Sequence, residues 1–124
     1  MDMLIGGKHI SSEDLEEVIN PYNGEVIDTI PIAHRQIADM AIEAANDAKS
    51  ALTEMSAFKI SNKLFNVVDK LREKRQEFAE LLTLEVGKPI NESLVEVDRS
   101  IETLKLAAEE AKRIYGESVP LDAG

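Results

Sequence analysis

Side chains that could do chemistry are few and widely spaced in this 124-residue chain. Cysteine is absent, which removes a thiolate nucleophile, thiolate metal ligands and disulfides, and favours a cytoplasmic protein. His9 and His34 have no second ligand at metal spacing, so we interpret both as solvated loop residues. Asp14, Glu16 and Glu17 lack the spacing of an EF-hand loop, so calcium binding is not expected.

Phosphate and polyanion binding are also weakly supported. Gly6-Gly7 lacks the GxGxxG or GxxxxGK context and is interpreted as a turn. Lys88 follows an expected helix end, where contact with terminal carbonyls is favoured over a cofactor phosphate. The chain carries 14 basic and 24 acidic side chains, a net charge of −10, which disfavours nucleic acid and anionic membranes as partners. The local basic cluster is interleaved with acids, as on a solvated helix face: Lys70, Arg72, Lys74 and Arg75 with Asp69, Glu73 and Glu77.

The first 33 residues are predicted to be a β-hairpin region. The apolar triplet Met3–Ile5 precedes a turn at Gly6–Lys8, and Ser11–Glu16 is expected to be an acidic loop. The β-branched runs Val18–Ile19 and Val26–Ile30 should pair around Asn23-Gly24, because both residues tolerate the positive φ of a tight hairpin. Pro31 lacks an N–H and should end the second run. The first eight residues have no basic and then apolar segments, so no secretory signal is expected.

Residues 34–116 are predicted to form three or four amphipathic helices. The first runs from His34 for roughly twenty residues, by its 3.6-residue period. Ser56 is the expected N-cap of the second, with a break near Lys74 and a C-cap at Gly87. The expected buried positions are Ile37, Ala41, Ala44, Ala48 and Leu52; then Ile60, Leu64, Val67, Val68 and Leu71; then Phe78, Leu81, Leu82 and Leu84.

The last helix should start at Pro89 and continue to Gly116. Its apolar positions recur every three or four residues: Ile90, Leu94, Val97, Ile101, Leu104, Ala108, Ala111 and Tyr115. A coiled coil is a weaker alternative to packing against a globular neighbour, because Ala108 and Ala111 are small for the core positions of a coiled coil. The remaining residues, 117–124, are expected to be an extended tail. No run approaches 18 apolar residues, so no membrane span is expected. The predicted fold class is mixed and mostly α.

Several segments, in order, resemble the N-terminal region of the aldehyde dehydrogenase superfamily. The opening Ile5–Lys8, the run Val18–Ile27 ("VINPYNGEVI"), the helix motif Ile42–Ala45 and the stretch Arg75–Pro89 ("RQEFAELLTLEVGKP") carry the resemblance. Ile114–Glu117 is similar to lactaldehyde, succinate-semialdehyde and non-phosphorylating glyceraldehyde-phosphate members. At Leu52–Met55 the chain lacks the Trp or Phe that members often carry.

The resemblance implies an N-terminal segment of an α/β oxidoreductase that converts an aldehyde into a carboxylic acid with NAD or NADP. Helices 34–116 would then cover one face of the cofactor-binding sheet, and the remainder of the chain and a homo-oligomer would be the partners. The 124 residues lack the catalytic cysteine, and we expect the general-base glutamate and the cofactor loop to lie downstream. The segment alone is therefore expected to bind no cofactor and to be inactive.

Two points are open at this stage. Family members often hold a monovalent cation, and the resemblance implies the carbonyls of Val18 and Ile19 with the carboxylate of Glu85 as its ligands here. A plain helix-end carboxylate at Glu85 is the alternative. For the whole chain, the alternative is a stand-alone, non-catalytic helical interaction or oligomerisation protein. A reading frame that continues past Gly124 would favour the enzyme.

Overall fold

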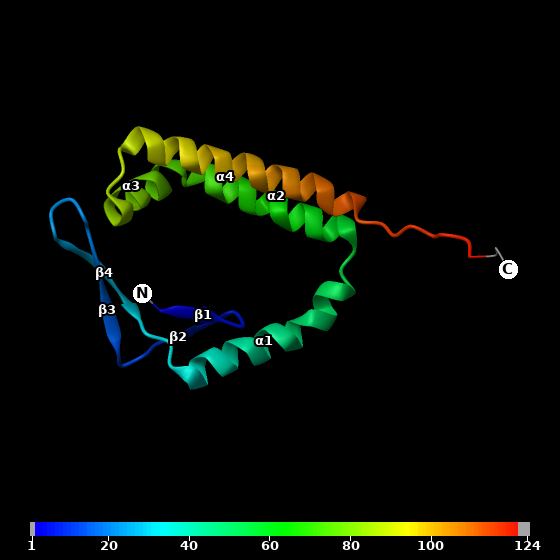
Figure 1. Ribbon diagram of the computed structural model, residues 1–124, viewed down its shortest axis with the longest axis horizontal. Helices are drawn as coiled ribbons and strands as arrows, with labels where there is room; N and C mark the ends of the chain where they lie inside the picture. Colours follow the sequence, from blue (N-terminus) through cyan, green and yellow to red (C-terminus); the bar gives the residue numbers. More distant parts are fainter. Residues whose placement is uncertain (1, 122–124) are drawn as a thin grey trace.

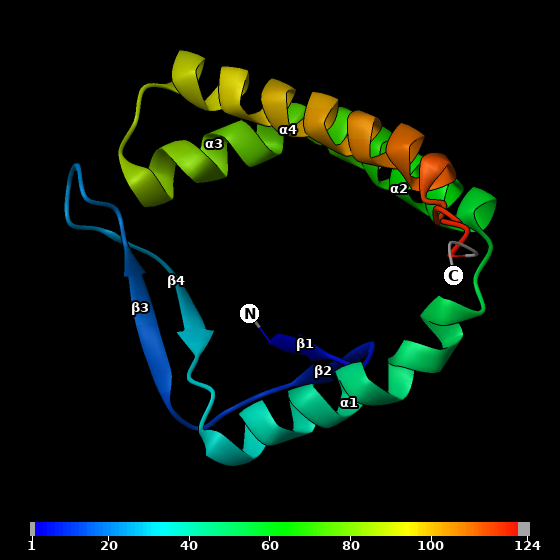
Figure 2. The ribbon, with the colours of Figure 1, turned by 45° about the vertical axis from the view of Figure 1, so that its right-hand side comes forward.

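The computed structural model describes residues 2–121, which form two antiparallel strand pairs and four helices (Figures 1 and 2). Helices α2, α3 and α4 lie together in one layer, whereas α1 and the strands lie apart from them. The mixed, mostly α fold class is confirmed, and the expected tail lies outside the described residues from position 122. The elements are β1 (Met3–Ile5), β2 (Lys8–Ile10), β3 (Leu15–Ile19), β4 (Val26–Pro31), α1 (Arg35–Thr53), α2 (Ala57–Glu73), α3 (Arg75–Val86), α4 (Ile90–Glu110) and the 3₁₀ turn η1 (Ala111–Arg113).

The first hairpin joins β1 to β2 through a two-residue turn. Gly6 and Gly7 have φ angles of 56° and 78°, the left-handed values that a primed hairpin turn requires. Lys8 is the first residue of β2 and not part of the turn, and His9 lies in β2 and not in a loop. A Cβ on Gly6 would lie 3.3 Å from the Cβ of Ala44, so this turn rests on α1.

The second hairpin pairs β3 with β4 and differs from expectation at both ends. Leu15 pairs with Pro31, so the expected loop Ser11–Glu16 is wrong at its last two residues, because cross-strand pairing extends the ladder through acidic sequence. The tight turn at Asn23-Gly24 is also wrong, because only Gly24 has positive φ.

A wider loop replaces that turn and is held by Asn20. The Asn20 N–H donates to the Glu25 carbonyl at 2.9 Å, and the Gly24 N–H donates to the Asn20 carbonyl at 2.8 Å. The Asn20 side-chain oxygen accepts from the Tyr22 N–H at 2.9 Å. This side-chain bond offers the backbone an alternative to a two-residue turn.

The packed core lies between α2, α3 and α4. Val68, Ala79, Val97 and Ile101 are buried, with Leu71, Leu94 and Leu104 packed around them. The stripes expected on α2 and α4 are confirmed at these positions but are wrong at Val67 and Ile90, which are exposed. The break at Lys74 is confirmed, as is the left-handed cap Gly87, with φ 74°.

The stripe expected on α3 is wrong at three of its four positions, since only Leu82 is partly buried. Phe78, Leu81 and Leu84 are 45%, 40% and 42% exposed, while Ala79 is fully buried. The reason is close packing by small residues, because α3 meets α4 through Ala79 and through a hydrogen bond between Thr83 and Ser93. The side chains of Phe78, Leu81 and Leu84 therefore face away from the core.

Helix α4 ends earlier than its apolar pattern predicts. It stops at Glu110, and after η1 the backbone of Ile114 is extended, so Gly116 does not end it. Ile114 and Tyr115 are 82% and 83% exposed, because η1 is the last segment that contacts α2 and nothing in the described chain covers them. No helix between residues 2 and 121 combines the length and the apolarity that crossing a bilayer requires.

Candidate functional site

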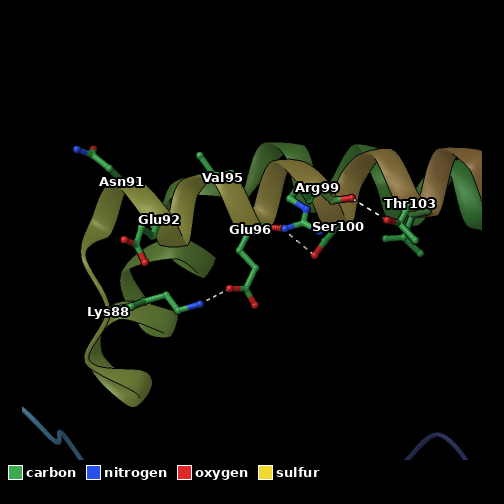
Figure 3. A pocket seen from close by; sticks show the side chains of 9 residues that line it. Lys88, Asn91, Glu92, Val95, Glu96, Arg99, Ser100 and Thr103 are labelled. Carbon is green, nitrogen blue, oxygen red and sulfur yellow. Dashed lines mark hydrogen bonds and ion pairs between the residues drawn. The ribbon is translucent and has the colours of Figure 1, made fainter.

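A groove runs along α4 from Lys88, just before the helix, to Leu104 (Figure 3). Its volume is about 850 Å³. Because α4 turns its apolar stripe toward α2 and α3, most of the groove wall comes from the opposite positions of the helix, with Leu104 of the stripe at its edge. The lining residues are Lys88, Asn91, Glu92, Val95, Glu96, Arg99, Ser100, Thr103 and Leu104.

Arg99 is the available cation of this groove. Lys88 forms an ion pair with Glu96, which Figure 3 shows across the start of the helix. Ser100 donates to the Glu96 carbonyl at 3.0 Å and Thr103 donates to the Arg99 carbonyl at 2.9 Å, so both hydroxyls bond to the helix backbone. Within residues 2–121, Arg99 forms no ion pair. A planar guanidinium suits a carboxylate, sulfonate or phosphate.

A second charged pair lies beside the groove. Arg75, the first residue of α3, donates from Nε to Asp98 Oδ1 at 2.5 Å and from Nη2 to Oδ2 at 2.7 Å. These bonds lower the pKa of Asp98 and raise that of Arg75, against a smaller opposing effect of desolvation. Asp98 also lines a smaller hollow of about 390 Å³ that shares Val95, Arg99 and Thr103 with the groove.

The residues of the implied cation site lie on two segments that meet in space. Val18 and Ile19 end β3, with a register shift between them, and Glu85 lies in the last turn of α3. Pro21 contacts Gly87, since a Cβ at Gly87 would lie 2.8 Å from Pro21 Cγ. The exposed Glu85 side chain has no hydrogen bond or ion pair within the described chain, so its carboxylate is available to a hard cation.

The other candidate residues have structural roles. Gly6-Gly7 is a turn, as expected. His34 precedes α1 and its Nε2 lies 2.6 Å from Asp14 Oδ2, so it is exposed but paired. No cluster of three His, Asp or Glu side chains in residues 2–121 could hold a metal ion.

Sequence reasoning missed Arg99, Asp98 and Arg75. A signal for Arg99 exists, because it is the one basic residue in the stretch 89–104 and lies opposite the apolar stripe. The partnership of Arg75 and Asp98 spans 23 positions between two helices, and no helical spacing rule predicts it.

Comparison with known proteins identifies relatives along nearly the whole chain. The profile of the aldehyde dehydrogenase family matches residues 9–124. Lactaldehyde dehydrogenase of Methanocaldococcus jannaschii is 42% identical over 97% of this chain and 26% of its own length. 3-Sulfolactaldehyde dehydrogenase of Priestia megaterium is 35% identical over 98% of this chain and 25% of its own.

Solved structures show the same arrangement of elements. Aldehyde dehydrogenase 21 from Physcomitrella patens, in complex with the reaction product succinate, is 37% identical, with a TM-score of 0.94 over 99% of this chain and 26% of its own. An NAD-dependent benzaldehyde dehydrogenase from Corynebacterium glutamicum is 27% identical, with a TM-score of 0.93 over 98% of this chain and 27% of its own. This chain thus spans about a quarter of the length of the relatives it matches.

Proposed function

The chain belongs to the aldehyde dehydrogenase family, and on that premise we propose that it is the N-terminal part of a longer enzyme that oxidises an aldehyde to a carboxylic acid with NAD or NADP. The observation that carries the proposal is the family match along nearly the whole chain. The nucleotide would accept a hydride from the substrate. The residues described here would supply structure and one wall of the substrate site. They would not carry out the covalent step, because the chain has no cysteine to form a thioester.

The structural role is to cover a sheet formed by the remainder of the polypeptide. We assign residues 1–33 to the hairpin region, 34–116 to covering helices and 117–124 to an extended tail. The outward apolar face of α3 supports this division, as does α1, which has no fully buried residue. Each large apolar side chain contributes roughly 1.5–3 kcal/mol when fully buried, so such faces favour a covering partner. The remainder of the chain is that partner, and the assembly is a cytoplasmic homo-oligomer.

The groove on α4 supports a small, short-chain substrate with an anionic end. One relative is named for 3-sulfolactaldehyde, which carries a sulfonate, and another was solved with succinate, which carries carboxylates, whereas the lactaldehyde of a third is short but neutral. Arg99 lies on the groove wall and forms no ion pair within residues 2–121, and it would bind a carboxylate or sulfonate at the end remote from the aldehyde. The other wall of the site would come from the remainder of the enzyme.

A structural Na⁺ or K⁺ at the β3–α3 junction also belongs to this proposal. The carbonyls of Val18 and Ile19 with the carboxylate of Glu85 offer hard oxygen ligands. The contact between Pro21 and Gly87 supports it, because that contact joins the two segments. Ion-replacement diffraction on the full-length protein that finds only water at this position would remove the cation.

The test begins with the coding sequence beyond Gly124. We expect the frame to continue into a glycine-rich strand–turn–helix and a cysteine-containing segment, and the purified full-length protein to reduce NAD or NADP with lactaldehyde, 3-sulfolactaldehyde or succinate semialdehyde. The 124-residue chain alone should give no NAD(P)H. A stop codon directly after Gly124 would contradict the enzyme and favour the stand-alone interaction protein.

A further inference from the structure

We propose that Arg75 is a positioning residue for Arg99: it holds the Asp98 carboxylate at the α3–α4 contact and so leaves the Arg99 guanidinium free for an anionic ligand. This inference rests on the proposed function, because it explains how the charge of the same groove is kept available. It concerns residues of this chain alone.

The three acidic residues nearest to Arg99 in sequence are engaged elsewhere, whereas Glu92, seven positions before it on the same groove wall, has no ion pair within residues 2–121. Glu96 and Glu102 stand three positions before and after Arg99, within the spacing at which helical side chains pair. Glu96 pairs with Lys88, and Glu102 pairs with Lys105 at 2.8 Å. Asp98, the residue directly before Arg99, pairs with Arg75. The two carboxylates at helical pairing distance from Arg99, and that of the adjacent Asp98, are therefore each bound to a different cation.

The Arg75–Asp98 pair differs from the other two in geometry. Both carboxylate oxygens of Asp98 accept a hydrogen bond from the planar guanidinium of Arg75, which fixes the orientation of the carboxylate as well as its position. The bond joins two helices, whereas Glu102 and Lys105 lie on one helix turn. Because Asp98 and Arg99 line the same hollow, a released Asp98 would place its negative charge beside the ligand.

Removing Arg75 should therefore weaken binding of anions and spare neutral substrates. In the full-length enzyme, Arg75→Gln is expected to raise the KM for the anionic substrate, sulfolactaldehyde, about twofold to fivefold, the size of one partly exposed charge interaction, with the kcat unchanged. The KM for neutral lactaldehyde should stay the same. Adding Asp98→Asn should restore the KM for the anionic aldehyde, because the released carboxylate is gone. Lys74→Gln is the matched control, since Lys74 pairs with Glu77 at the same junction without contacting Asp98.

A binding measurement separates this inference from the proposed function. Calorimetric titration of the full-length protein with succinate, and with its neutral diamide, should show a weaker Kd for succinate alone in Arg75→Gln and recovery in the double variant. If the protein oxidises no aldehyde but this pattern holds, the enzymatic proposal fails and the role of Arg75 stands. If Arg75→Gln changes neither probe, changes both equally, or is not rescued by Asp98→Asn, the role of Arg75 is wrong.

Discussion

The ring of Pro21 lies against Gly87, so that the loop between β3 and β4 touches the turn between α3 and α4 across 66 positions of sequence; a Cβ on Gly87 would approach Pro21 Cγ to 2.8 Å. Gly87 meets two demands at once. Its φ of 74° caps α3 in the left-handed region, and its bare α-carbon admits the proline ring.

Gly87→Ala should therefore cost more than backbone strain alone. Left-handed φ in a non-glycine residue costs about 1–2 kcal/mol, and Gly24→Ala provides that reference, because Gly24 has φ 75° with open space around it. We expect Gly87→Ala to lower the free energy of unfolding by about 1 kcal/mol more than Gly24→Ala, as for other overpacked contacts. Urea denaturation of the two variants measures the difference. Equal losses of the free energy of unfolding would show that the Pro21 ring moves aside without destabilising the fold.

Two buried serines should respond in opposite directions to the same substitution. Ser61 is buried and its Oγ has no hydrogen-bond partner in the described chain, whereas Ser93 Oγ lies 2.9 Å from Thr83 Oγ1. Ser61→Ala should raise the free energy of unfolding by about 1 kcal/mol, because an unsatisfied buried hydroxyl is removed. Ser93→Ala should lower the free energy of unfolding by a similar amount, because it leaves the Thr83 hydroxyl without its hydrogen-bond partner. Thermal melts that move both variants in one direction would contradict this assignment.

The cap of α2 should contribute measurably to stability. Ser56 Oγ accepts from the Lys59 N–H at 3.4 Å, a long bond, so Ser56→Ala should cost about 0.5–1 kcal/mol, the lower part of the range for N-caps. Ser50→Ala, on exposed helix surface in α1, should leave stability unchanged or slightly raised, because alanine is the better helix former. Denaturation midpoints compare the two, and a loss at Ser50 equal to that at Ser56 would remove the capping role.

Stability should fall in acid partly through Asp98. Hydrogen bonds from Arg75 lower the pKa of Asp98, so its contribution is present above the ordinary aspartate pKa of about 4 and is lost as the pH falls through the lower folded-state value. Between about pH 4 and pH 2, the free energy of unfolding should fall less steeply in Asp98→Asn than in the wild-type chain. Urea titrations at several pH values test this, and parallel curves would mean that the pair is not linked to folding.

Sequence reasoning located the elements that have local signals. Helix α2 begins after the expected cap Ser56, α3 ends at the expected Gly87, and the break at Lys74 is where the apolar pattern is interrupted. These features depend on residues close in sequence, whose capping and backbone preferences are strong. The family resemblance predicted the family to which the chain belongs.

The errors lie where tertiary contacts override local pattern. Nothing in the sequence of α3 says that Ala79, and not Phe78, faces α4, because that choice depends on how closely the helices approach. Likewise, the apolar stripe of α4 continues to Tyr115 although the surface it packs against ends earlier. The groove residue Arg99 was missed for the same reason, since its lack of a partner follows from which helix positions its neighbours reach.

The absence of a fully buried residue in α1 divides the chain into parts with different folding behaviour. A helix of this length is marginal in water unless its apolar side packs against something, and its main contact here is the small β1 strand. Helices α2 to α4 share a core and can fold cooperatively. Helix α1 is free to fray, so its amide protons should exchange early. The polypeptide would then consolidate in two stages, with its first helix the last to become rigid.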